Sequence, residues 1–200
     1  MTRHCRLPLL SACAMLASTA LIALPAAASA ASPKVLLVTR GEAGEGPPAV
    51  QGEAAHVSNS ITWPALNAGC GGTDEQATVG KNPSGTVKVS GSGQPVSSQC
   101  FNESPFEFVP GGITVKSVSV SKAGVVKLTG DLELVLGECT YSAKKLAGTQ
   151  VFGEDFTEKL SGTGKLAGHS AKTCAKTTPV EDFIGVADAS GFDYVVKLTS

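Results

Sequence analysis

Cysteine is the residue type whose number and spacing in this sequence point most clearly to chemistry. Of six cysteines, four lie beyond residue 30, at Cys70, Cys100, Cys139 and Cys174. Even the nearest neighbours in this set, Cys70 and Cys100, are far apart in the sequence, whereas zinc sites are built from close pairs such as Cys-x-x-Cys. An even number of well-separated cysteines is typical of disulfides in exported proteins. We therefore expect two disulfides and no metal or other cofactor.

Residues that could act in catalysis are few. Beyond residue 30 the histidines are His56 and His169, and the sequence has no Gly-x-Ser-x-Gly motif that would hold a serine nucleophile. Glu107 and Glu181 could serve as the paired carboxylates of a glycoside hydrolase. Exposed charges with lysine partners explain these two residues more simply. We therefore assign no catalytic residue.

Two further kinds of binding site have little support. The acidic groups at 154–158 and 181–188 lack the spacing of a calcium-binding loop, and we expect solvated loops there. Carbohydrate-binding surfaces generally present exposed aromatic rings, but aromatic residues make up 5% of the chain. Trp63 lies beside Ile61 in an expected strand, which favours a place in the core. Neither calcium nor carbohydrate is the favoured ligand.

The N-terminal segment, 1–30, has the organisation of a secretory signal peptide. Arg3 and Arg6 supply a positive N-terminal region, an apolar stretch follows at 7–24, and Ala28-Ser29-Ala30 offers small residues for cleavage. We predict cleavage after Ala30. The alternatives are a retained membrane anchor and lipidation at Cys13. Prolines interrupt the anchor, and the long apolar run lies after Cys13 rather than before it.

The charge of the chain beyond the signal limits its partners. Arg3 and Arg6 are lost with the signal, so 14 of the 16 basic side chains remain against 17 acidic ones, a net charge of −3. Because the charges are spread along the chain, we expect no nucleic-acid or anionic-membrane partner. No later segment has the length and apolar character of a membrane-spanning helix. We expect a protein that is secreted or held at the cell envelope, and the alanine-rich signal is typical of bacteria.

Short runs rich in Val, Thr, Ile and Phe, separated by Gly, Pro, Ser or Asn, predict β-strands rather than helices. A leading strand at Val35–Val38 is followed by an expected flexible loop that reaches residue 55. We predict a hairpin turn at Ser121–Gly124, a tight turn at Gly130-Asp131 and a bulge at Lys116-Ser117. The clearest further strands are Thr86–Ser90, Phe106–Val109, Ile113–Val120, Val125–Thr129, Leu132–Leu136 and Tyr194–Leu198.

The sequence also resembles itself along its length. Lys88–Gly93 is similar to Lys159–Gly164, and Val125–Thr129 recurs as Val195–Thr199. The cysteines follow the same order in both copies. We interpret the pattern as an ancestral duplication, with halves near 56–130 and 131–200. Convergent β-rich composition is the alternative.

The predicted halves suggest the disulfide pairing and the fold. The simplest pairing places one bridge in each half, Cys70–Cys100 and Cys139–Cys174. Since each half has little apolar material of its own, we expect one shared core. The prediction is an all-β protein, an antiparallel β-sandwich or barrel-like domain. Its predicted segments are a signal at 1–30, a strand and loop at 31–55, and the β domain at 56–200.

A family resemblance rests on the signal, on Cys139-Thr140-Tyr141 with the later Cys174, and on the closing Phe192-Asp193-Tyr194-Val195-Val196. Together these segments resemble small secreted β-rich proteins of unknown function from actinobacteria. The resemblance covers much of the chain beyond residue 30 and includes no functional motif. It implies a secreted bacterial protein and no particular activity.

We expect a secreted, non-enzymatic protein that binds an unknown ligand or partner or is associated with the cell envelope. The alternatives are a hydrolase with paired carboxylates and a carrier of a small ligand. These functions make different structural demands. A hydrolase needs two carboxylates facing each other across a cleft, whereas a carrier needs an apolar cavity large enough for its ligand.

Overall fold

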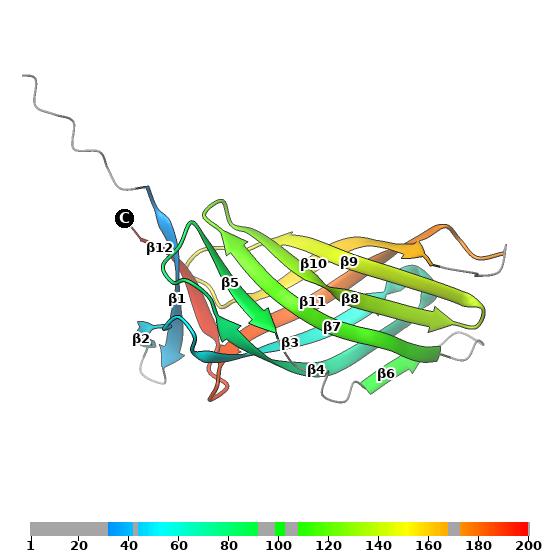
Figure 1. Ribbon diagram of the computed structural model, residues 1–200, viewed down its shortest axis with the longest axis horizontal. Helices are drawn as coiled ribbons and strands as arrows, with labels where there is room; N and C mark the ends of the chain where they lie inside the picture. Colours follow the sequence, from blue (N-terminus) through cyan, green and yellow to red (C-terminus); the bar gives the residue numbers. More distant parts are fainter. Residues whose placement is uncertain (1–31, 42–43, 92–98, 103–107, 168–172, 200) are drawn as a thin grey trace, which may run out of the picture. The chain divides into compact units, whose positions relative to one another are not determined.

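The computed structural model describes residues 32–41, 44–91, 99–102, 108–167 and 173–199, and for 72–75, 99–102 and 108–112 it describes the backbone alone. The predicted signal peptide therefore lies outside the described residues, as do His169 and Glu107. Most of the described chain is β-strand, and its one helical element is a short 3-10 helix, which confirms the predicted fold class (Figure 1). The elements are β1 (Lys34–Gly41), β2 (Gly44–Pro48), β3 (Ala54–Trp63), the 3-10 helix η1 (Pro64–Leu66), β4 (Ala68–Val79), β5 (Thr86–Gly91), β6 (Gln99–Asn102), β7 (Phe108–Ser121), β8 (Val125–Leu136), β9 (Cys139–Thr149), β10 (Thr157–Leu166), β11 (Thr177–Asp188) and β12 (Tyr194–Thr199).

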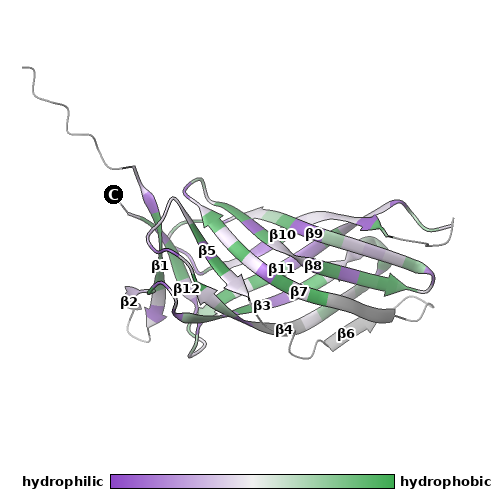
Figure 2. Ribbon diagram, viewed as in Figure 1, coloured by the Kyte–Doolittle hydropathy of each residue, from purple (hydrophilic) through white to green (hydrophobic). Residues whose placement is uncertain are grey.

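The strands form because apolar and polar residues alternate along them. In β8 every second residue from Val126 to Leu136 is buried, and in β3 the buried positions run from Ala55 to Trp63 in the same way. This period of two places one set of side chains on each face of the sheet. Figure 2 shows the resulting change from hydrophobic to hydrophilic colour along the strands. The apolar face of the sheet can therefore pack into a hydrophobic core.

Eight of the described strands form a closed, barrel-like sheet. Each of β3, β4, β5, β7, β8, β9, β10 and β11 pairs antiparallel with the next in this order, and β11 pairs back onto β3. The short β6 pairs with β4 beyond the end of β5. Because the ring follows the chain order, the connections between strands alternate between its two ends. One end holds η1, the β8–β9 turn and the β10–β11 connection.

A second sheet, β12-β1-β2, is attached at the opposite end of the ring. Val35 of β1 forms a bridge with Ser84 in the β4–β5 connection, and Val195 of β12 forms one with Asp155 in the β9–β10 connection. The Tyr194 hydroxyl donates a hydrogen bond to Glu53 at 3.3 Å. Burial, together with the nearby Glu53 charge, raises the pKa of the Tyr194 phenol. This end of the closed sheet is therefore covered by strands.

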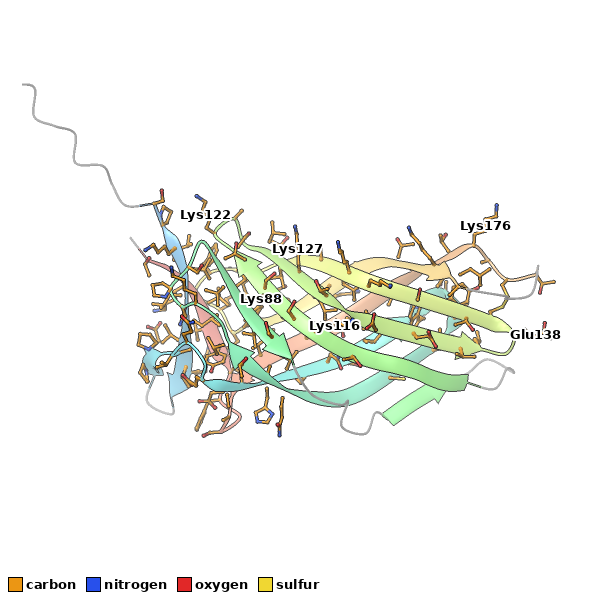
Figure 3. The ribbon with its side chains drawn as sticks, in the orientation of Figure 1. Lys88, Lys116, Lys122, Lys127, Glu138 and Lys176 are labelled. Atoms are coloured by element: carbon orange, nitrogen blue, oxygen red, sulfur yellow. A yellow bond between two sulfur atoms is a disulfide. The ribbon has the colours of Figure 1, made fainter. Side chains whose placement is uncertain are left out.

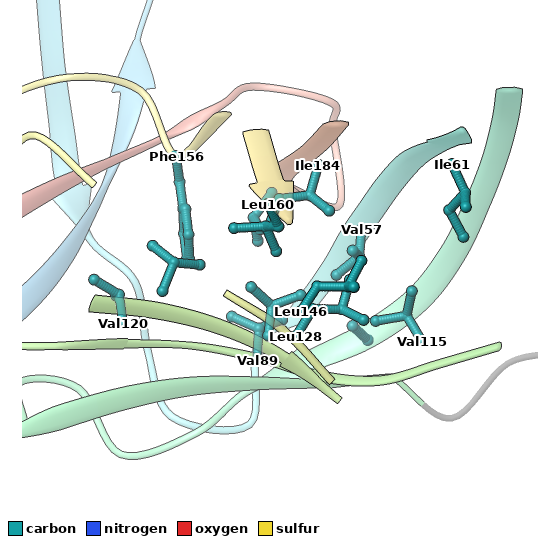
Figure 4. Close-up of a cluster of buried hydrophobic side chains, with 14 of the residues drawn as sticks. Val57, Ile61, Val89, Val115, Val120, Leu128, Leu146, Phe156, Leu160 and Ile184 are labelled. Carbon is teal, nitrogen blue, oxygen red and sulfur yellow. The ribbon is translucent and has the colours of Figure 1, made fainter. Parts of the chain in front are cut away.

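Both predicted halves contribute to one hydrophobic core. The buried cluster joins Val57, Val89 and Leu128 with Leu160 and Ile184, which point toward one another between the strands (Figure 4). Residues of the small sheet belong to the same cluster, and the strands lie within one compact unit of residues 31–200. Such burial stabilises by about 25 cal/mol per Å² of apolar surface. The two sheets are thus held together by a common interior.

Several local predictions agree with the structure. The Ser121–Gly124 hairpin joins β7 to β8, with Gly124 at φ +73° and its N–H donating to the Ser121 carbonyl at 2.8 Å. The pairing of β7 with β8 is irregular between Val115 and Ser117, at the predicted bulge. β5 and β12 also lie at predicted positions. Of the predicted strand Phe106–Val109, the first two residues lie outside the described residues.

The tight turn predicted at Gly130-Asp131 is wrong. Both residues lie inside β8, which is continuous from Val125 to Leu136. Gly130 does not have a positive φ, and a side chain there would meet the Thr114 carbonyl oxygen of β7. The glycine therefore permits a close approach of two strands rather than a turn. The proposed boundary between the halves at 130/131 falls within this strand.

Two other local predictions are also wrong. The segment expected to be a flexible loop contains β2, which pairs with β1 although its sequence is Gly-Glu-Gly-Pro-Pro; an edge strand tolerates proline because one side of its backbone needs no partner. The acidic group at 181–188 lies in β11, where Asp182 is buried.

Asn82 fastens the small sheet to the closed sheet. Its Oδ1 accepts a hydrogen bond from the Leu37 N–H at 2.9 Å, and its Nδ2 donates to the carbonyls of Leu37 at 3.0 Å and Ala49 at 2.7 Å. Asn82→Ala removes all three bonds, and we expect the free energy of unfolding to fall by about 2 kcal/mol. Chemical denaturation measures this loss.

Two further variants test the role of Asn82. Asn82→Asp keeps the acceptor but directs a carboxylate oxygen at two carbonyl oxygens, so it should be at least as destabilising as alanine. Lys81→Ala alters an exposed neighbour and should change stability by less than about 0.5 kcal/mol. Equal stability of Asn82→Ala and Lys81→Ala would contradict the role given to the amide.

Candidate functional site

The Cys139–Cys174 disulfide is present, with a Cα–Cα distance of 5.7 Å. It joins the first residue of β9 to the connection before β11. Both cysteines line a pocket of about 560 Å³ at the end of the closed sheet that the small sheet does not cover. The disulfide therefore forms part of a pocket wall as well as a link between two strands.

Three connections build this pocket. Leu66 comes from η1, Leu136, Gly137 and Glu138 come from the end of β8 and its turn, and Thr173 and Ala175 flank Cys174. Most of these side chains are apolar or small. A volume of this size lies within the range of small-molecule sites, which often occur at the mouths of β-barrels. The geometry thus provides a half-open apolar site rather than a sealed void.

One lining residue of the pocket, Tyr141, is part of an aromatic pair. Tyr141 lines the pocket and is buried, and its ring centre lies 6.3 Å from that of Trp63 in a tilted arrangement. Trp63 is 3% exposed, which confirms its predicted place in the core. Gly164 on β10 makes room for it, since a side chain at 164 would overlap the indole ring. The lining residue Tyr141 is therefore held in place by packing against Trp63.

Charge is scarce among the described residues that line this pocket. Among the described lining residues, Glu138 alone is charged, and it lies in the turn between β8 and β9 (Figure 3). Lys176 lies near the same end but does not line the pocket. A bound anion would therefore meet a carboxylate and no cation among the described residues of the lining. The pocket is better suited to a neutral molecule or to one with a positive group at its rim.

Cys70 is buried on β4 and is bonded in a disulfide. Its register partner on β6 is Cys100, whose side chain lies outside the described residues. Directly opposed residues of neighbouring strands are close enough to support the predicted Cys70–Cys100 pairing. That bridge stays a prediction. Cys70 does not line the pocket beside Cys139.

Of the two carboxylates considered for catalysis, the structure describes Glu181 alone. Glu181 forms an ion pair with Lys159 at 2.7 Å, the kind of partner expected from the sequence, and Glu107 lies outside the described residues. Asp131 and Glu133 line a smaller hollow on the outer face, but a hydrogen bond from Lys116 holds the pKa of Asp131 below its usual value. A general acid needs a raised pKa.

Carboxyls with raised pKa values lie near the other end of the closed sheet. Burial is the main cause for both Glu158 and Asp193, with smaller contributions from the charges of Glu154 and Asp155 respectively. Neither group lines the pocket beside the disulfide or the hollows on the outer face. His56 lies on β3. These groups give no catalytic constellation around a cleft.

Metal-binding and membrane-spanning features are absent from the described part of the chain. Within it, no group of three or more His, Cys, Asp or Glu side chains is arranged to hold a metal ion. None of its helices is long and apolar enough to cross a membrane.

Sequence reasoning found the cysteines but missed the pocket. Leu136 and Thr173 are close in sequence to the predicted disulfide residues Cys139 and Cys174. The part of the pocket wall next to the disulfide could therefore have been predicted from the sequence. Leu66 had no such signal, because its position depends on η1 folding toward the β8–β9 turn. The apolar site is a product of three connections that are distant in the sequence.

Comparison with known proteins adds no relative. No family model matches the chain, and no curated protein or solved structure is significantly similar to it.

Proposed function

We propose that this protein is a secreted, non-enzymatic binding protein that takes up a small apolar ligand in the pocket beside the Cys139–Cys174 disulfide. The observation that carries the proposal is the apolar, half-open pocket of about 560 Å³ at the uncovered end of the closed sheet. This combines the binding function expected from the sequence with the small-ligand alternative. Export is supported by the signal-like segment 1–30 and by the disulfide.

Rigidity favours binding at this site. The disulfide ties the β8–β9 turn region to the connection before β11, and Tyr141 packs against the buried Trp63. A preorganised wall loses little conformational entropy when a ligand enters. Affinity can then come from the apolar surface that the ligand removes from water.

The lining also selects a ligand class. Leu66, Leu136 and Tyr141 offer apolar surface, and Glu138 offers a negative charge. We infer a neutral or cationic ligand with a largely apolar body. A fatty acid or another apolar anion would bring its charge toward Glu138 and should bind less well.

The hydrolase alternative receives less support. It requires two carboxylates on either side of a cleft, one of them with a raised pKa. The described pocket beside the disulfide contains one carboxylate, and the Asp131 carboxyl in the outer hollow has a lowered pKa. The apolar pocket therefore favours binding over hydrolysis.

Titration with the neutral dye Nile red tests the proposal. Trp63 is the single tryptophan of the chain and packs against the pocket residue Tyr141, so its fluorescence reports events at this site. We expect saturable binding of one dye per chain, with a change in Trp63 emission. Leu66→Glu places a charge in the pocket wall and should weaken binding by about tenfold or more.

The matched control is Val50→Glu, which alters an exposed apolar residue outside the pocket. It should bind dye like the unaltered protein. Circular dichroism establishes that both variants are folded. Unsaturable binding, or equal loss in both variants, would refute the pocket as the ligand site. A comparison with a fatty acid of similar size tests the inferred preference against anions.

A further inference from the structure

The alternation of β9 breaks at Lys144 and Lys145. Both neighbours are exposed, although consecutive strand residues normally point to opposite faces. The break coincides with irregular pairing on both sides of the strand. The register shifts against β10 between Ser161 and Lys165, and against β8 between Thr129 and Leu132. A bulge of this kind redirects side chains, and bulges are enriched beside functional sites.

A third lysine lies across from the bulge. Lys165 of β10 pairs in register with Ser142 of β9, and it is exposed on the same outer face as Thr163. These residues surround a surface hollow of about 420 Å³, lined by Ser142, Ala143, Lys144, Lys145, Thr163 and Lys165. The hollow therefore has three ammonium groups, two hydroxyls and no carboxylate in its lining.

The charges around the hollow determine which lysines matter most. Lys144 lies close enough to Asp131 to lower the pKa of that carboxyl, although the principal partner of Asp131 is Lys116. The negative charge of Asp131 therefore offsets part of the positive charge that Lys144 presents to the hollow. In the described structure neither Lys145 nor Lys165 forms an ion pair. These two lysines should contribute most to the attraction of an anion.

We propose that the hollow between β9 and β10 binds a phosphate group, either free or as part of a phosphate-rich molecule. Ammonium groups attract the doubly charged oxyanion, and the hydroxyls of Ser142 and Thr163 can donate hydrogen bonds to its oxygens. This hollow is separate from the apolar pocket, since the two share no lining residue. The even charge distribution inferred from the sequence thus becomes a local cationic site in the folded chain.

Nuclear magnetic resonance titration of the folded protein tests this site. The probes are inorganic phosphate, glycerol 3-phosphate and long-chain polyphosphate, which distinguish a free ion, an ester and a polymer as sources of the group. We expect amide shifts confined to 142–145 and 163–165. Lys145→Gln combined with Lys165→Gln should weaken binding about five- to tenfold, and added salt should weaken it further.

The control is Lys88→Gln combined with Lys127→Gln. These lysines lie on the outer faces of β5 and β8, outside the hollow (Figure 3). This pair removes the same charge and should change affinity by less than about twofold. Equal weakening by both pairs would mean general attraction to a basic face, and absence of shifts with all three probes would mean no site. Either result overturns the proposal.

Discussion

Replacement of both Cys139 and Cys174 by alanine should lower the free energy of unfolding by about 4 kcal/mol, because the bond closes a loop with a sequence separation of 35 residues. Without the bond the unfolded chain gains the entropy that this loop had removed. The loss should appear in denaturant unfolding under oxidising conditions. The double variant should also bind Nile red more weakly, since both cysteines line the pocket.

The second pair of cysteines provides the comparison. Replacement of Cys70 and Cys100 opens a predicted loop of similar length, so its loss of stability should be similar. Dye binding should persist, because Cys70 does not line the pocket. A loss below about 1 kcal/mol on removal of Cys139–Cys174 would contradict the chain-entropy account. Loss of dye binding in the Cys70 and Cys100 variant alone would contradict the placement of the ligand.

Predictions that depended on local pattern were mostly correct. Alternation identified β5 and the central part of β7, and an apolar run identified β12, whose first three residues are all buried. The Ser121–Gly124 hairpin was predictable because a turn needs a residue that tolerates positive φ, and Gly124 supplies it. In such segments the residues themselves determine the conformation.

Predictions failed where a neighbouring strand determines the outcome. Glycine is common in turns, but the role of Gly130 is to let the backbone of β8 approach Thr114. β2 contains residues with low strand propensity, and its structure comes from backbone pairing with β1. Asp182 of β11 is acidic, but its side chain is buried. These features depend on contacts between distant segments, which local sequence patterns do not contain.

The candidate sites show the same division. The cysteines that border the apolar pocket were identified, because their number and spacing are visible in the sequence. The pocket itself requires Leu66 to meet the β8–β9 turn, which follows from closure of the ring. The hollow between β9 and β10 had a local signal in the adjacent Lys144 and Lys145. The exposure of both lysines and the position of Lys165 beside them follow from the pairing of β9 with β10, which the sequence pattern did not predict.

Gly130→Ala should lower the free energy of unfolding by about 3 kcal/mol, although it adds a single methyl group. The new Cβ would lie 2.3 Å from the Thr114 carbonyl oxygen and 3.3 Å from the Val115 Cα, both in the backbone of β7. A flexible side chain could move aside, but a paired strand cannot do so without losing ladder hydrogen bonds. The pairing of β7 with β8 would therefore be disturbed near its centre.

Gly85→Ala is the matched control for Gly130→Ala. A Cβ at Gly85 meets no atom within 4 Å, and this glycine does not have a positive φ. Alanine there should leave stability unchanged or raise it by about 0.5 kcal/mol, because it restricts the unfolded chain. Thermal and denaturant unfolding of both variants measure the difference. If Gly130→Ala is as stable as Gly85→Ala, the close approach of β8 to β7 at Thr114 is wrong.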